Sequence, residues 1–265
     1  MTQPAHYQWR RTPFIANRWL RYGIWLVSAA YLVWAVATLE FDWARIEEGM
    51  TRAVQIFDGA FPLDYSRWEL LISGFIESIQ IAIIATIAGI LLSIPAGILA
   101  ARNIVPRFVY LLGRAIVIVA RSFHPVIVAI IFVKAVGFGP LAGILTLIVY
   151  TVGFVGKLIA ESIEEIDPGQ VEAIKATGAG YFKTLTFAVF PQIMPRQVGL
   201  TIYQFDINLR ASTIVGIVGA GGIGGTLMNS FRRYDYDFSF AILSLIIALV
   251  IFGEWVSGKL RKRIT

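Results

Sequence analysis

Long apolar stretches separated by short polar segments make up most of the chain. A helix needs about 20 mostly apolar residues to cross about 30 Å of hydrocarbon. About six spans are expected, and they run from Tyr22 to Leu39, Ile79 to Ala101, Pro125 to Val136, Leu141 to Ile159, Val198 to Val218 and Phe238 to Val256. The third is short, and Val109 to Ala120 before it is expected as a helix at the cytoplasmic interface or partly embedded. The pattern predicts an all-α polytopic membrane protein.

Composition supports this class and excludes others. Of the 265 residues, 57% are hydrophobic and 15% are charged, with a mean hydropathy of +0.71. Soluble domains carry about 25% charged residues, and disordered chains are poor in apolar ones. Cysteine is absent, which excludes disulfides, a thiolate metal site and a cysteine nucleophile.

The net charge of +6 raises the question of nucleic-acid binding, and the positions of the charges answer it. Lys and Arg gather at the N-terminus, around residues 102–107, between residues 175 and 196, and after residue 258. The intervening connections are acidic or nearly uncharged, apart from Arg232 and Arg233, which Asp235 and Asp237 offset. Basic connections stay cytoplasmic in membrane proteins. The charge therefore predicts both termini in the cytoplasm and no nucleic-acid partner.

The first apolar stretch has two interpretations. Its basic start and the run Ala35-Val36-Ala37 are also typical of a cleaved signal peptide. The apolar run exceeds the usual 7–15 residues of such a signal, which favours a retained anchor.

The longest cytoplasmic connection, residues 161–195, contains the signals of a short helix. Asp167 suits the N-cap, Pro168 the first turn, Gln170 a capping box, and Gly178 the residue just beyond the end. A helix from Pro168 to Thr177 is only about 15 Å long, too short to cross a bilayer. It either ties two spans together at the surface or docks a partner.

A resemblance favours docking. Glu172-Ala173-Ile174, then Gly178 and Pro191, resemble the EAA loop of permeases of ATP-binding-cassette (ABC) importers; Ile174, Ala188 and Phe190 depart from its pattern. In that family the loop is the coupling helix that docks on the ATPase subunit. This chain has no Gly-x-x-x-x-Gly-Lys-Ser/Thr phosphate loop. The resemblance therefore implies that ATP, with Mg, is used by a separate ATPase chain, and that this chain has no cofactor and no catalytic residue.

Polar residues interrupt the fifth span, namely Asp206, Asn208, Arg210 and Ser212. Charges at membrane depth are costly and usually face a protein interior or a water-filled cavity. Asp206 and Arg210 are four apart and can pair, whereas Asn208 points about 200° away from both at the helical period. The set is either a contact between helices or subunits, or a translocation pathway in which Arg210 attracts an anion.

A glycine motif follows directly, with Gly219, Gly221, Gly222 and Gly224 in a run that matches Gly-x-Gly-x-x-Gly. A dinucleotide-binding fingerprint needs a preceding strand, a following helix and an acid about 20 residues on. The flanking sequence does not fit, so a closely packed gate or hinge is expected. A membrane-embedded nucleotide enzyme is the alternative, but His6 and His124 are the only histidines and paired carboxylates are missing. We expect no metal site.

A second resemblance narrows the family. The block from Phe205 to Gly224, the run Arg121-Ser122-Phe123-His124-Pro125 and the segment from Ile131 to Pro140 resemble the phosphonate-uptake permeases (PhnE type) of the binding-protein-dependent, MetI-like superfamily. His124 departs from the apolar or small residue usual there; it either caps the break before Pro125 or has a proton or ligand role.

This resemblance implies a permease subunit of an ATP-driven importer in the bacterial inner membrane, carrying phosphonate, phosphite, phosphate or another small solute. It also implies a homodimer, two ATPase copies and a periplasmic solute-binding protein. A structural or assembly subunit is a third hypothesis. The expected organisation is residues 1–68 (tail, first span and periplasmic loop), 69–259 (transmembrane domain) and 260–265 (basic tail).

Overall fold

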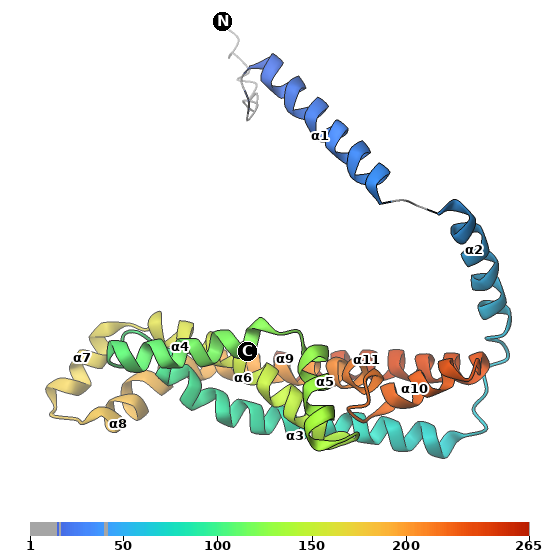
Figure 1. Ribbon diagram of the computed structural model, residues 1–265. Coiled ribbons are helices and arrows are strands. Elements are labelled where there is room, and N and C mark those ends of the chain that lie inside the picture. The colour runs from blue at the N-terminus through green and yellow to red at the C-terminus, as the bar shows by residue number, and fades with distance from the viewer. Residues whose placement is uncertain (1–14, 16, 40–41, 265) are drawn as a thin grey trace, which may run out of the picture. The chain divides into compact units, whose positions relative to one another are not determined.

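The computed structural model describes residues 15, 17–39 and 42–264, with side chains as far as residue 260. The chain divides into two compact units, Met1–Ile56 and Phe57–Thr265. Every regular element in the described residues is helical (Figure 1).

The first unit contains α1 (Arg18–Thr38) and most of α2 (Trp43–Asp58). Asn17 caps α1 by accepting a hydrogen bond from the Trp19 amide at 3.0 Å. Within this unit, apolar side chains lie all around α1 and none of them is buried. A helix that is apolar on all sides is typical of a membrane span. Sequence reasoning missed α2, although its apolar residues recur at the helical period from Trp43 through Ile46 and Met50.

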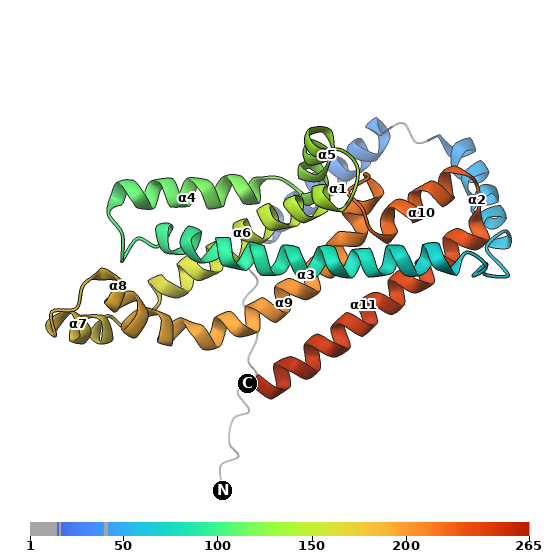
Figure 2. The ribbon, with the colours of Figure 1, turned by 90° about the horizontal axis from the view of Figure 1, so that it is seen from below.

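The second unit holds the remaining helices. They are α3 (Trp68–Leu99), α4 (Arg107–Ser122), α5 (Pro125–Val136), α6 (Pro140–Glu164), α7 (Pro168–Ala176), α8 (Tyr181–Thr184), the π-helical turn η1 (Leu185–Val189), α9 (Phe190–Ile217), α10 (Ile223–Arg232) and α11 (Tyr236–Ile264). Helix α3 packs along α6, and α9 packs against α3, α6, α10 and α11. The short helices α7 and α8 lie at one end of this unit and α10 at the other (Figure 2).

Four described helices are long and apolar enough to span a membrane: α1, α3, α6 and α11. The predicted third span is α5, whose 12 residues are too short to cross a membrane. Helix α5 meets α4 at a bend of 93°. Together α4 and α5 form one broken span or a re-entrant loop. The predicted fifth span is α9, whose 28 residues are long enough to cross a membrane but include the charged Arg196, Asp206 and Arg210. The all-α, multi-pass membrane fold is confirmed.

Small residues allow α3 and α6 to approach closely. A Cβ atom on Gly97 of α3 would lie 2.5 Å from Ile159 Cγ2 of α6, and one on Gly89 would lie 2.6 Å from Thr151 Cβ. Membrane helices associate through such contacts because lipid supplies no hydrophobic force between them.

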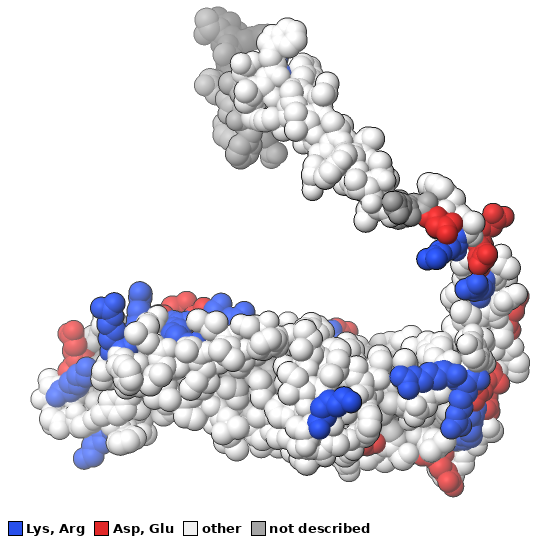
Figure 3. Space-filling model, in the orientation of Figure 1, with Lys and Arg blue, Asp and Glu red and all other residues white. Residues whose placement is uncertain are grey.

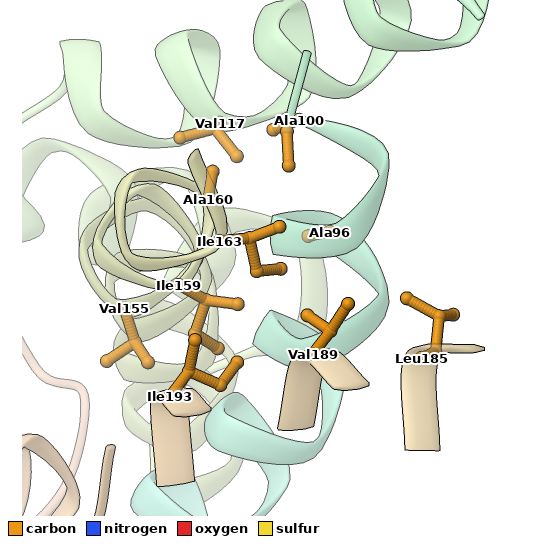
Figure 4. Packing of buried hydrophobic residues seen from close by; sticks show 11 residues of the cluster. Ala96, Ala100, Val117, Val155, Ile159, Ala160, Ile163, Leu185, Val189 and Ile193 are labelled. Carbon is orange, nitrogen blue, oxygen red and sulfur yellow. The ribbon is translucent and has the colours of Figure 1, made fainter. Parts of the chain in front are cut away.

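Next to α7, a hydrophobic cluster fixes the segment that follows it. Ile159 and Ile163 of α6 pack with Val189 of η1, Ile193 of α9 and Ala96 of α3 (Figure 4). The half-buried Val171 of α7 packs against the same cluster. Packed side chains therefore link α7 to α3, α6 and α9.

Candidate functional site

A cavity of about 600 Å³, which we call the central cavity, lies where α4, α5, α6 and α9 meet. Its polar lining includes Arg121, His124, Tyr150 and Arg210, and the rest is mostly apolar. Three basic side chains from separate parts of the sequence thus line one hollow. Sequence reasoning selected Arg210 for the pathway but gave Arg121 no such role.

The break between α4 and α5 places two of these residues. Phe123 and His124 adopt extended backbone angles, as residues near a following proline tend to do. Pro125 then starts α5, and His124 Nδ1 accepts a hydrogen bond from the Val126 amide at 3.4 Å. His124 therefore caps the break and also lines the central cavity. With Nδ1 accepting, a neutral His124 ring carries its proton on Nε2.

Arg210 is positioned by the carboxylate one turn earlier. Its Nη2 atom lies 2.8 Å from Asp206 Oδ2, which confirms that the two residues pair. The Asp206 side chain is 7% exposed, whereas that of Arg210 is 42% exposed. A guanidinium has five N–H donors, so Arg210 keeps further donors for a molecule in the cavity.

Asn208 belongs to a different, neutral cluster between α3, α6 and α9. Its Nδ2 donates to Thr86 Oγ1 at 2.9 Å and to Thr151 Oγ1 at 3.0 Å, and its Oδ1 accepts from Gln204 Nε2 at 3.0 Å. All four side chains are buried. Ser212 is buried as well, and its hydroxyl donates to the Leu209 carbonyl at 2.8 Å. Neither Asn208 nor Ser212 lines the central cavity.

The glycine segment connects α9 to α10 in a tight turn. Gly219, Gly221 and Gly222 have positive φ angles of 91°, 81° and 77°, which side chains disfavour. A Cβ atom on Gly222 would lie 2.6 Å from Ser78 Oγ, and Gly224 lies against the Thr213 carbonyl. A dinucleotide-binding fingerprint requires a strand before its glycines, and helix α9 stands there instead. The glycine segment is therefore not such a fingerprint.

A further hollow of about 680 Å³ borders the glycine segment and α10, and we call it the outer hollow. Gly216, Gly219, Gly221 and Arg232 contribute to its wall. Val215, one residue before Gly216, lines the central cavity. The two spaces are thus neighbours along α9.

The connection between α6 and α9 forms nearly as expected. Asp167 Oδ1 accepts from the Gly169 amide at 2.9 Å, and Gly178 has a φ of 79° just beyond α7. Glu172 and Ala173 are exposed, and Ile174 is half-buried.

Two details of this connection differ from expectation. The capping box with Gln170 does not form, because the Asp167 amide donates instead to Gln192 Oε1 of α9 at 2.9 Å. The expected loop from 161 to 195 also includes the end of α6 and the start of α9. Pro191 stands in the first turn of α9, directly after η1. Since proline has no amide to donate, irregular helix is expected there.

Charged side chains gather at the two ends of the second unit, and the face between them is nearly free of charge (Figure 3). Among the residues whose placement is described, no group of three or more His, Asp and Glu side chains could hold a metal ion.

The long apolar helices and the broken α4–α5 pair define a multi-pass membrane protein, and three basic side chains line the cavity where α4, α5, α6 and α9 meet. Residues 93–265 match the family described as "Binding-protein-dependent transport system inner membrane component", and the chain belongs to this family. It is therefore a permease subunit of a transporter and not an enzyme.

Two curated relatives agree with this family. The chain is 40% identical to the phosphate-import permease protein PhnE of Mycolicibacterium smegmatis over 94% of its own length, but spans 47%, about half, of that protein. It is 37% identical to the phosphite transport system permease protein PtxC of Stutzerimonas stutzeri, covering 96% of this chain and 90% of that protein.

The fold also matches a solved structure. A chain of the MetNI methionine ABC transporter, in an inward-facing conformation, superposes with a TM-score of 0.66 at 23% identity. The match covers 77% of this chain and 100% of the other. It supports the MetI-like permease fold.

Proposed function

We propose that this permease subunit moves a small phosphorus oxyanion into the cytoplasm, with phosphonate as the leading candidate and phosphite or phosphate next. The observation that carries this proposal is the convergence of Arg121, His124 and Arg210 on the central cavity. Relatives named as phosphate-import and phosphite permeases support the substrate class.

The chemistry of the cavity suits such a solute. The planar arginine fork can donate two parallel hydrogen bonds to a tetrahedral oxyanion, and His124 can donate from Nε2. Apolar neighbours such as Ile207 and Ile214 also line the cavity. Attraction between arginine and an anion is stronger in this setting than in bulk water.

Partners complete the proposed transporter. A second copy of this chain forms the permease dimer, two ATPase chains use ATP with Mg, and a periplasmic solute-binding protein delivers the solute. The complex lies in the bacterial inner membrane with both termini of the permease in the cytoplasm. The solute enters through the outer hollow, where the packed glycine segment of Gly219, Gly221, Gly222 and Gly224 acts as the gate.

Helix α7 is the proposed docking element for the ATPase, with Glu172, Ala173 and Ile174 in the contact and Gly178 and Pro191 bounding the lever. The exposure of Glu172 and Ala173 supports this role. The cluster around Ile159 and Val189 would pass the movement of α7 to the spans.

Substitution of Glu172 tests the coupling. We expect Glu172→Arg to abolish ATPase docking and uptake together, because it reverses a charge in the contact. Lys183→Glu, a reversal on the neighbouring exposed helix α8, is the matched control and should leave both intact. Docking and uptake at the wild-type level in the Glu172 variant would show that the coupling assignment is wrong.

The substrate is tested with the purified permease, its ATPase and its binding protein in liposomes. ATP-driven accumulation of labelled methylphosphonate, phosphite or phosphate is the expected result. If the complex accumulates a different solute and none of these three, the substrate class is wrong although the permease assignment stands.

A further inference from the structure

A second basic hollow lies beside the central cavity, between α4 and α6. It has a volume of about 260 Å³, and its lining includes Arg114, Arg121 and Lys157. Arg121 belongs to the walls of both spaces. We call this space the inner hollow.

The helix periods order the two spaces along the molecule. Arg114 lies seven residues before Arg121 on α4, and Lys157 lies seven residues after Tyr150 on α6. Seven residues are about two turns, or about 10 Å, so each pair shares a helix face. Helix α6 continues past Lys157 to Glu164, where the chain leaves for α7. The inner hollow is therefore displaced from the central cavity toward the end that carries α7.

The charges of the inner hollow are only partly balanced. Arg114 Nη2 lies 2.9 Å from Glu164 Oε1, and Lys157 Nζ lies 3.1 Å from Glu161 Oε1. Arg121 has no carboxylate within ion-pair distance among the residues described by the structure. Three cations thus face two carboxylates, which leaves an excess positive charge where an anion could bind.

Arg114 also has an unused hydrogen-bond donor. Its Nε atom is buried and has no partner among the described residues. A buried donor without an acceptor is costly. The ion pair with Glu164 therefore leaves one donor of Arg114 unused, and an anion in the inner hollow would accept from it if the side chain turned toward that space.

We propose that Arg114, Arg121 and Lys157 form a second binding station for the transported oxyanion, on the cytoplasmic side of the central cavity. The anion passes between stations by exchanging partners on the shared Arg121. Glu161 and Glu164 compete with the anion for the same cations and so keep binding weak enough for release, as transport through successive sites requires. This inference rests on the proposed function.

The absence of cysteine in the chain gives a direct test. In the complete transporter, Lys157→Cys removes one cation of the inner hollow, and 2-aminoethyl methanethiosulfonate restores a positive charge there. The sulfonatoethyl reagent instead adds a negative charge. Lys134→Cys in α5, which lies outside both spaces, is the matched control, and the treated wild-type complex reports any effect on partner subunits.

We expect uptake of labelled methylphosphonate or phosphate by Lys157→Cys to fall about tenfold, as for the loss of one charged hydrogen bond. The cationic reagent should restore it to within twofold, and the anionic reagent should not. Uptake equal to that of Lys134→Cys, or equal restoration by both reagents, would overturn the second station.

The result is separable from the proposed function. A wild-type complex that takes up no phosphorus oxyanion contradicts the proposed substrate. A wild-type complex that transports, together with an Arg210 variant that does not and a Lys157 variant that does, contradicts only the inner station.

Discussion

The two polar sides of α9 differ in charge and in surroundings. On one side, Gln204 and Asn208 bond to each other and to Thr86 and Thr151, and the whole cluster is neutral and buried. On the other, Asp206 and Arg210 are charged, and Arg210 reaches the central cavity.

This difference separates two uses of polarity at membrane depth. Neutral side chains that bond to one another join helices at little cost, and in this cluster only Gln204 Oε1 is left without a partner among the described residues. A charge is more costly there and is usually kept for a cavity or a pathway. A polar residue in a membrane helix is therefore weak evidence for a role in transport. A charged residue that also lines a cavity is stronger evidence.

The largest effect is expected from Arg210→Gln, which replaces the cation with a shorter, neutral polar side chain. Uptake should fall at least about a hundredfold, because a charged hydrogen bond to the anion is worth about 1.5–3 kcal/mol and the Asp206 charge is left unpaired. ATP-driven uptake in liposomes is the measurement.

Arg233→Gln is the matched control for this loss of charge. Arg233 is exposed after α10 and does not line the central cavity. Its variant should transport at the wild-type rate. Equal rates for the Arg210 and Arg233 variants would remove the distinction between the two sides of α9.

Asp206→Asn tests the role of the counter-charge and should have a smaller effect. With the carboxylate gone, Arg210 is less well oriented but attracts the anion more strongly. We expect the maximal uptake rate to fall about tenfold and the half-saturating solute concentration to fall with it, because release becomes slower. An unchanged maximal rate would show that Asp206 only offsets charge.

Asn208→Ala tests the neutral side and should affect stability more than transport. The variant leaves Gln204, Thr86 and Thr151 short of partners, at a cost of about 1 kcal/mol for such a contact in a membrane protein. Thermal unfolding in detergent should show a lower midpoint, while uptake per folded transporter stays within twofold. Thr201→Ala, whose hydroxyl bonds only within α9, controls for loss of a polar group. A hundredfold loss of uptake in Asn208→Ala would place this side on the pathway.

Much of the local structure could be predicted because its causes lie close together in the sequence. The Asp167 cap, the Gly178 turn and the pair of Asp206 with Arg210 depend on residues within one or two turns. The partners of Asn208 could not, since Thr86 and Thr151 lie 122 and 57 residues away along the chain. Packing between helices brings them together, and a single sequence does not reveal that packing. Arg121 could have been selected as a cavity residue because it is a cation next to an apolar stretch.

The smallest effect on uptake is expected from a charged cluster just before the starts of α3 and α11, for which no transport role is proposed. Arg67 lies 2.7 Å from Asp235 and 3.2 Å from Asp64, over the Phe238 ring. Hydrogen bonding from Arg67 lowers the pKa of Asp235. A lowered folded-state pKa means that this stabilisation is present above the unfolded value of about 3.9 and is lost as the pH falls through the folded value.

Arg67→Met should therefore lower the midpoint of thermal unfolding at pH 7. When the pH is lowered below about 4, the midpoint of this variant should decrease less than that of the wild type. Because the pair is partly exposed, its contribution is at most about 1 kcal/mol. Uptake at pH 7 should remain within twofold of wild type. If Arg67→Met instead matched Arg210→Gln in its loss of uptake, charge anywhere on this chain, and not charge in the central cavity, would govern transport.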